Sequence, residues 1–221
     1  MNEALNKINP KELDGKNARL WQEWADIDAL CTKRKDAAGL TRRPSISYII
    51  RRKNIVGLPT KYEIVYRCKS IVGITEDTHE PIFGNEHKML IELPNNYPAA
   101  DGNPSFVFRT QVWHPNIRYA GSFQGRVCLT INEMGTLASL KDLIVRVERY
   151  LKYELYHAKN TYPYPEDQGV AEWVREEGEP NGWLRFSQGD ATPAPQPEPA
   201  PTDSSNAGPN TVAPKKKTIS I

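Results

Sequence analysis

The residues best suited to chemistry lie within one stretch, residues 113–129. It contains Trp-His-Pro-Asn-Ile at 113–117 and Gly-Arg-Val-Cys-Leu at 125–129. A thiolate at Cys128 would be a strong nucleophile near neutral pH and also a good leaving group, and carrying an acyl group requires both properties. Asn116 carries a side-chain amide, which can donate a hydrogen bond. A structural or surface thiol and a plain asparagine turn are the alternatives.

The other two cysteines fall on predicted core faces. Cys31 lies on the apolar stripe of a predicted helix and Cys68 on the inward face of a predicted strand, so both are expected to be structural thiols. The cysteines have no metal-like spacing, and the histidines are scattered along the chain. No metal site and no phosphate-binding glycine loop are therefore expected. Cys128 is the only cysteine predicted to lie on a loop.

The elements that must position this stretch follow from the spacing of apolar residues. Helical spacing predicts a helix over Asn17–Asp36, with basic residues at its end and Gly39 as its stop. Alternating patterns predict strands at Ile46–Arg51, Tyr62–Val72, His87–Leu93 and Ser105–Thr110. Because short turns link these strands, an antiparallel meander is expected.

After the cysteine the apolar period becomes helical again. A helix is predicted over Leu137–Tyr156, with an apolar stripe wide enough to pack on the sheet. A loop rich in tyrosine and proline leads to a short helix around Asp167–Glu177. The apolar segment Trp183–Phe186 is expected to dock on the domain. Beyond it the sequence is mostly small or polar residues and proline, which cannot bury enough surface to offset chain entropy.

Length and composition set the remaining expectations. The chain allows one domain, with a flexible N-terminus over 1–16, a folded domain over 17–186 and a disordered, proline-rich tail with a basic end over 187–221. A net charge of +2 gives no argument for nucleic-acid binding. The sequence contains no run of 18 apolar residues, the length that a membrane-spanning helix would need, and no signal peptide is evident. Free thiols then favour a cytoplasmic protein.

Taken together, the two motifs resemble the active site of the ubiquitin-conjugating enzymes. Tyr97 and Pro98, with Pro104, resemble the family's Tyr-Pro and Pro-Pro segment, although here a single proline precedes Ser105. The expected order of elements over Asn17–Glu177 is also similar to that family. The resemblance implies an α+β, UBC-like fold with an N-terminal helix, a four-stranded antiparallel meander, an active-site loop and C-terminal helices.

The chain departs from the family pattern in two places. The family cysteine usually follows the histidine by about ten positions, whereas Cys128 follows His114 by fourteen, with the extra residues in Arg118–Gln124. The family also usually has a tryptophan beyond the cysteine, and Asn132–Leu137 contains none. With its tail, the divergent chain looks more like conjugating proteins of bacterial ubiquitin-like pathways, with antiphage defence as a candidate setting.

The resemblance implies a role for each residue of the two motifs. Cys128 would carry the modifier as a thioester, and Asn116 would stabilise the oxyanion or brace the loop. His114 would be chiefly structural, and Pro115 would fix the backbone that aims the amide. No metal or other cofactor is expected, because a separate activating enzyme would consume the ATP.

The family often places an acidic or polar residue in the loop after the helix that follows the cysteine. Asn160 falls near that place, with Glu166 and Asp167 close by. Each of these residues is also typical of a loop or a helix cap, so none is assigned a catalytic role.

The implied partners are an activating enzyme, ubiquitin or a ubiquitin-like modifier, and a target protein, with a ligase as a further candidate. Lys33–Lys35 and Arg42–Arg43 could meet an acidic surface of the activating enzyme, although a solvated helix end is the alternative. Neither nucleic acid nor a membrane is expected as a partner. Two other functions stay open: a catalytically inactive UBC-fold scaffold, and a cysteine hydrolase that would need His114 as its base.

Overall fold

The first part of the chain is more ordered than its polar composition predicts. The computed structural model describes residues 3–32, 34–35, 41–42, 44–99, 101–129 and 139–188. Helix α1 spans Glu3–Asn6, and a 3-10 turn follows at Pro10–Glu12. Leu5 of α1 is only 2% exposed and belongs to the main core, with Ile8 packed against that core. The expectation of a flexible segment over 1–16 is therefore corrected for its described residues.

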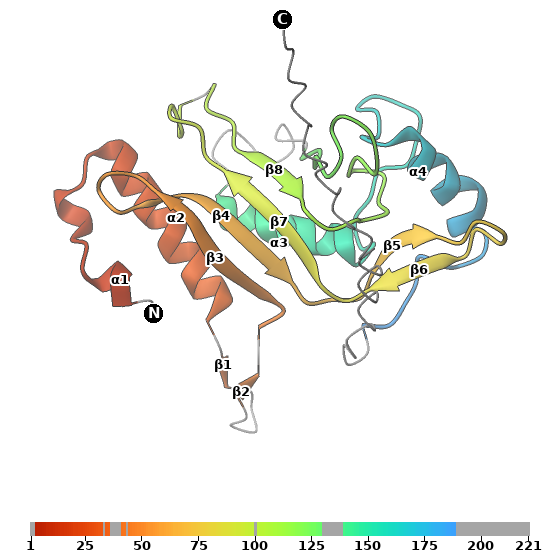
Figure 1. Ribbon diagram of the computed structural model, residues 1–221, viewed down its shortest axis with the longest axis horizontal. Helices are drawn as coiled ribbons and strands as arrows, with labels where there is room; N and C mark the ends of the chain where they lie inside the picture. The colour runs from red at the N-terminus through yellow and green to blue at the C-terminus, as the bar shows by residue number, and fades with distance from the viewer. Residues whose placement is uncertain are drawn as a thin grey trace, which may run out of the picture.

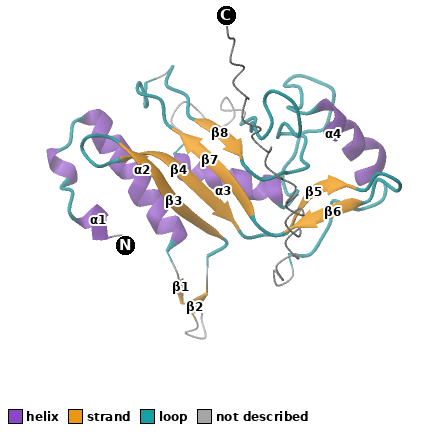
Figure 2. Cartoon of the chain, viewed as in Figure 1, coloured by secondary structure: helices purple, strands orange, loops and turns teal. Residues whose placement is uncertain are grey.

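Helix α2 spans Gly15–Cys31 (Figures 1 and 2). Its apolar stripe packs into the main core. The side chain of Asp14 caps it by accepting a hydrogen bond from the backbone N–H of Asn17. The predicted C-terminal end at Asp36 is wrong, because the backbone turns extended at Thr32. Gly39, which was predicted to end this helix, lies outside the described residues.

The basic residues expected at the helix end belong instead to a small hairpin. Strand β1, Arg34–Lys35, pairs with strand β2, Thr41–Arg42, in antiparallel register. Lys33 and Arg43 lie outside the described residues. The two strands project below the rest of the chain in Figure 1.

Four antiparallel strands form the main sheet, in the order β3-β4-β7-β8, which confirms the predicted meander. Their bounds are Ile46–Lys53, Pro59–Tyr66, His87–Glu92 and Ser105–Phe108, respectively. The inward side chains of the two central strands, such as Tyr62, Ile64, Met89 and Ile91, are fully buried. This side of the sheet forms the core against the helices.

The single strand predicted over Tyr62–Val72 divides in two. β4 ends at Tyr66, and β5, Ser70–Ile74, pairs with β6, Pro81–Gly84, in a separate small sheet. Between them the backbone N–H of Arg67 bonds to Ser45, and the Cys68 carbonyl accepts from the His87 ring. Alternation of apolar residues continues through this turn, so periodicity alone could not reveal the break. Cys68 is buried, as predicted.

The C-terminal helices pack against the main sheet and against the small β5–β6 sheet. Helix α3, Leu140–Leu151, is capped by Ser139 and is shorter than predicted; in Figure 1 it passes behind the main sheet. Helix α4, Gln168–Trp173, continues into a π-helical turn at Val174–Gly178. Trp183 stacks on Trp173 of α4 at 6.2 Å between ring centroids, which confirms the predicted docking of this segment. No described helix is long and apolar enough to cross a membrane.

Candidate active site

The loop that carries the two motifs closes on itself at its base. The backbone N–H of Cys128 donates to the carbonyl of Asn116 at 2.8 Å, and Ile117 pairs with Val127 in an antiparallel bridge. The N–H of Arg118 then bonds to the Arg126 carbonyl at 2.9 Å. The extra residues therefore leave and return as a closed hairpin. Although they lengthen the sequence between His114 and the cysteine, they do not separate Asn116 from it.

The returning leg of this hairpin is bonded to the edge strand β8. Phe108 donates its N–H to the carbonyl of Gly125, and Val127 donates to Phe106, at 2.8 and 3.0 Å. Gly125 has φ of +82°, and a Cβ there would lie 2.2 Å from the carbonyl oxygen of Phe108. Only glycine fits this close approach. The backbone of β8 thus sets the position of the cysteine one residue beyond Val127.

His114 is fully buried and both of its ring nitrogens have partners. Nε2 lies 3.2 Å from the carbonyl of Leu155, and Nδ1 accepts the backbone N–H of Asn116 at 3.1 Å. Its ring stacks on Tyr150 with 5.0 Å between centroids. Burial lowers the pKa of His114 to about 3. A neutral ring that is committed on both sides is suited to holding the loop and poorly suited to taking a proton from substrate.

Asn116 is 6% exposed, and its side chain bridges two loops. Oδ1 accepts the backbone N–H of His157 at 2.9 Å, which ties the residue to the segment after α3. Pro115, one residue earlier, accepts the N–H of Asp167 at 3.0 Å. With its oxygen engaged, the amide has only its N–H groups left to offer. The side chain therefore links this loop to the segment after α3, and the described residues show no acceptor for its N–H groups.

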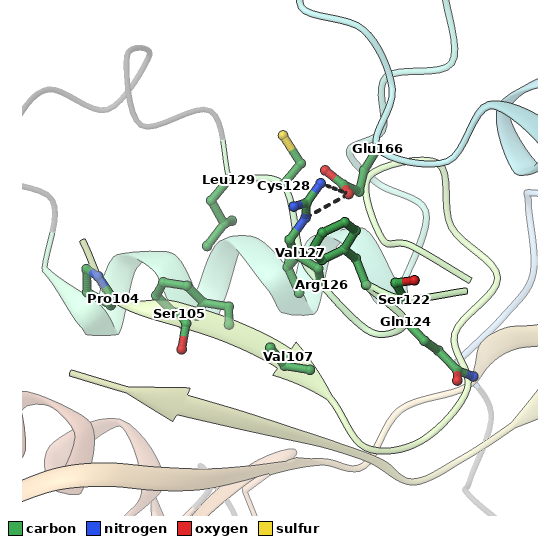
Figure 3. Close-up of a pocket in the computed structure, with 12 residues that line it drawn as sticks. Pro104, Ser105, Val107, Ser122, Gln124, Arg126, Val127, Cys128, Leu129 and Glu166 are labelled. Atoms are coloured by element: carbon green, nitrogen blue, oxygen red, sulfur yellow. Dashed lines mark hydrogen bonds and ion pairs between the residues drawn. The ribbon is translucent and has the colours of Figure 1, made fainter. Parts of the chain in front are cut away.

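Cys128 is half-buried and opens on a pocket of about 550 Å³. The walls come from the β8 edge, the tip of the hairpin and the residues around the cysteine (Figure 3); they include Phe106, Val107, Phe123, Val127 and Leu129. In Figure 3 the sulfur points away from Ser105 and Val107. Burial, followed by the Glu166 carboxylate, raises the pKa of the Cys128 thiol, while Arg126 and Arg146 act to lower it.

Glu166 contributes a carboxylate to this pocket and forms ion pairs with both legs of the hairpin. Its Oε1 lies 2.7 Å from Arg126 Nη2 on the returning leg, and 3.6 Å from Arg118 Nε on the outgoing leg. Only 10% of its side chain is exposed. Sequence reasoning considered Glu166 but gave it no role. A signal was present in the two arginines that flank the insertion, since a partly buried guanidinium needs a carboxylate.

The two neighbouring candidates have other functions. Asp167 caps α4 by accepting the N–H of Val170, and its second oxygen accepts the N–H of Tyr119 in the insertion. Asn160 is exposed and does not line the pocket. The tryptophan-free segment beyond the cysteine lies outside the described residues. Among the residues that the structure describes, no group of three or more His, Cys, Asp or Glu could hold a metal ion.

Comparison with solved structures returns ubiquitin-conjugating proteins. A protein designated a ubiquitin conjugating enzyme from Plasmodium yoelii aligns at 21% identity and TM-score 0.47, over 76% of this chain and 88% of that one. A ubiquitin conjugating enzyme E2 domain of Toxoplasma gondii aligns at 23% and 0.46, over 74% and 88%. Human ubiquitin-conjugating enzyme E2 G1 aligns at 19% and 0.39, over 65% and 97%.

No protein-family model matches the chain, and a search of the curated proteins finds no match. Each of the three structures named above aligns with a TM-score below 0.5.

Proposed function

We propose that the protein is a conjugating enzyme of the ubiquitin-conjugating type. Cys128 would receive ubiquitin or a ubiquitin-like modifier from an activating enzyme as a thioester and transfer it to a lysine of a target. One observation carries the proposal: a thiol opens on a pocket while the residue hydrogen-bonded across from it, Asn116, brings a side-chain amide to the same loop. The bacterial pathway stays a prediction, because nothing described here bears on it.

The first step is a thioester exchange. The Cys128 thiolate attacks the carbonyl carbon of the incoming thioester; the new C–S bond forms as the old one breaks, and the activating enzyme's thiolate leaves. No net oxidation or reduction occurs. The raised pKa of Cys128 makes the thiolate the minor form at neutral pH, so the rate of this step should rise with pH.

The second step transfers the acyl group to nitrogen. A neutral amine attacks the thioester carbonyl, the C–N bond forms, the C–S bond breaks, and the amine proton leaves so that Cys128 is a thiol again. The side-chain N–H of Asn116, for which the described residues show no acceptor, is suited to stabilising the oxyanion between these events. Glu166, on the pocket wall, is suited to orienting the incoming ammonium and lowering the cost of bringing it out of water.

Partners follow from this proposal. The activating enzyme would supply the modifier and consume ATP, and it would approach α2 and the neighbouring β1–β2 hairpin. Reversing the charges of Arg34 and Arg42 should then slow thioester loading and sharpen its dependence on salt. Unchanged loading would leave these residues as a solvated surface.

A hydrolase is the weaker alternative. It needs a base next to the nucleophile, but the His114 ring is buried with both nitrogens engaged, and none of the residues that line the described pocket is a histidine. A catalytically inactive scaffold would bind the same partners without a covalent adduct. The loading test therefore discriminates between it and an enzyme.

The test is incubation with a ubiquitin-activating enzyme, ATP and ubiquitin, read on a non-reducing gel and by intact mass. We expect one adduct that reducing agent removes. Cys128→Ala should abolish it, whereas Cys31→Ala and Cys68→Ala, which change the two thiols packed in or against the main core, should keep it. An adduct that survives Cys128→Ala overturns the assignment of the sulfur. For other modifiers, the same three variants provide the matched comparison.

A further inference from the structure

Among the residues that the structure describes beside Cys128, two arginines of the hairpin lie close to one carboxylate. Arg126 lines the pocket, and its Nη2 and Nε both bond to Oε1 of Glu166, at 2.7 and 2.9 Å. Arg118 lies 3.6 Å from the same oxygen, too far for a hydrogen bond. Within the described part of this cluster, the guanidinium groups of Arg118 and Arg126 thus share the one carboxylate of Glu166. The cluster carries a net charge of about +1 when all three groups are ionised.

An acceptor lysine would add a third cation to this cluster. Its ammonium would approach the only described carboxylate on the pocket wall, where Arg126 already holds one oxygen. Like charges brought within a few ångströms in a partly buried site repel more strongly than they do in bulk water. A lysine alone is therefore a poor match for this pocket, and a further negative charge would offset the mismatch.

Arg126 is placed to accept such a charge. Its side chain is 48% exposed, so its guanidinium faces solvent as well as Glu166. The ring of Phe123, at the exposed tip of the insertion, lies 4.5 Å from its Cζ and would keep it near the pocket mouth after it leaves Glu166. Arg126 could then pair with a carboxylate of the acceptor while the lysine takes Glu166.

We infer that the preferred acceptor is a lysine with an acidic residue beside it, because Arg126 and Glu166 exchange their ion pair for two new pairs with that acceptor. This inference rests on the proposed function. It makes Arg126 the residue that determines acceptor specificity. The chemistry of transfer is unchanged: the lysine amine forms the new C–N bond, the C–S bond to Cys128 breaks, and the amine proton returns the sulfur to its thiol form.

The test uses a synthetic acyl donor, so that neither the modifier nor the activating enzyme need be known. The full-length protein is incubated with the 2-mercaptoethanesulfonate thioester of acetyl-glycyl-glycine, and acylation of Cys128 is followed by intact mass. The acylated protein is then mixed with one of two peptides, acetyl-Ala-Glu-Lys-Glu-Ala-amide or acetyl-Ala-Gln-Lys-Gln-Ala-amide. Acylated peptide is quantified against time.

We expect transfer to the glutamate-flanked peptide to be about fivefold faster, which matches the strength of a partly exposed ion pair. Arg126→Gln should bring the two rates together, and Arg126→Glu should make the glutamate-flanked peptide the slower one. Arg51→Gln is the matched control, because Arg51 pairs with Glu63 on β4 at 2.9 Å and does not line the pocket. It should keep the wild-type preference.

The outcomes separate the two proposals. If Cys128 is not acylated, the proposed function fails, and the inference fails with it. Acylation followed by equal transfer to both peptides overturns the inference and leaves the proposed function standing. A preference that persists in Arg126→Gln also overturns it, because the acidic neighbour would then be recognised elsewhere.

Discussion

Two regions of this molecule each bury a histidine and hold cysteine, yet only Cys128 lines the pocket beside the active-site loop. In the core between α2 and the main sheet, burial raises the pKa of both Cys31 and Cys68 to about 12. In the loop at the end of β8, Cys128 opens on a pocket. The core cysteines lie on the inward faces of a helix and a strand end, whereas Cys128 lies just past the point where the strand pairing stops.

The difference shows what makes a cysteine available in this fold. Both regions are tightly hydrogen-bonded, so rigidity does not distinguish them. The distinction is geometric: the backbone of β8 holds residues 125–127 in the sheet, and the next residue is free to turn its side chain outward.

Alkylation of the three thiols should separate the two regions most strongly. A thiol with a pKa of about 12 is ionised in roughly one molecule in 10,000 at pH 8. With iodoacetamide at pH 8, we expect Cys128 to react more than about tenfold faster than Cys31 or Cys68, because the two core thiols are almost entirely protonated. Peptide mapping by mass spectrometry measures the three rates. Comparable rates at all three positions would break the comparison.

Alkylation also reports on the charges around the sulfur. Because the Glu166 carboxylate raises the pKa of Cys128 and Arg126 lowers it, Glu166→Gln should move the pH–rate curve to lower pH and Arg126→Gln to higher pH. Glu63→Gln, on the outer face of β4, provides the control for a carboxylate far from the pocket.

Removal of the Asn116 amide should affect transfer more than loading. We expect Asn116→Ala to form the thioester but to discharge it to lysine about 100-fold more slowly, the loss typical of one oxyanion donor. Some stability should also be lost, because the N–H of His157 would lose its acceptor. Single-turnover discharge measures the effect below the unfolding transition. Equal discharge rates in the two proteins would leave Asn116 with the bracing role alone.

Most of the fold could be predicted from apolar spacing, since each long element buries one face. The four-stranded meander, the first helix and the helix after the cysteine all carry that spacing. The break after Tyr66 could not be predicted, because the apolar alternation runs on to Val72 while the backbone bonds change partners. The ordered N-terminus was also missed, since a single buried leucine anchors it.

The candidate site divides in a similar way. Cys128 and Asn116 could be found from local sequence, because their chemistry belongs to their residue types. Glu166 could not, since its part in the pocket depends on two arginines 40 and 48 positions earlier that only the closed hairpin brings to it. The effect of the insertion was unpredictable for the same reason: its closure depends on backbone bonds between Asn116, Arg118 and the returning leg.

Substitution of two glycines in the loop region tests whether its pairing with β8 holds the sulfur in place. Gly125→Ala should cost about 3 kcal/mol of unfolding free energy, because its φ is +82° and its new methyl group would meet the Phe108 carbonyl. Gly121→Ala, with φ of +85° but open space around it, should cost about 1 kcal/mol. Urea titration gives both values. If the two losses are equal, the close contact with β8 has no energetic weight.

Each region contains one buried histidine, and the two should make the free energy of unfolding depend on pH in a similar way. The pKa of His114 is lowered to about 3 and that of His87 to about 4, mainly by burial, while an unfolded histidine has a pKa near 6.5. The unfolded chain therefore binds protons first as the pH falls. Stability is fully present above about pH 6.5 and is lost toward the folded values, by about 1.4 kcal/mol per pH unit for each histidine.

Between pH 6.5 and 5 each histidine should thus remove about 2 kcal/mol of unfolding free energy. Urea titrations in this interval measure the total, and His87→Asn should remove about half of the slope while leaving thioester loading in place at pH 7. His114→Asn should also halve the slope, but it removes the acceptor of the Asn116 N–H and should slow loading or transfer. If the two variants have similar slopes of unfolding free energy against pH but different loading or transfer rates, burial of both histidines stabilises the fold while only His114 supports activity. If His87→Asn slows loading as much as His114→Asn does, the sheet core and the active-site loop are coupled. The two regions would then differ less than the reactivities of their cysteines indicate.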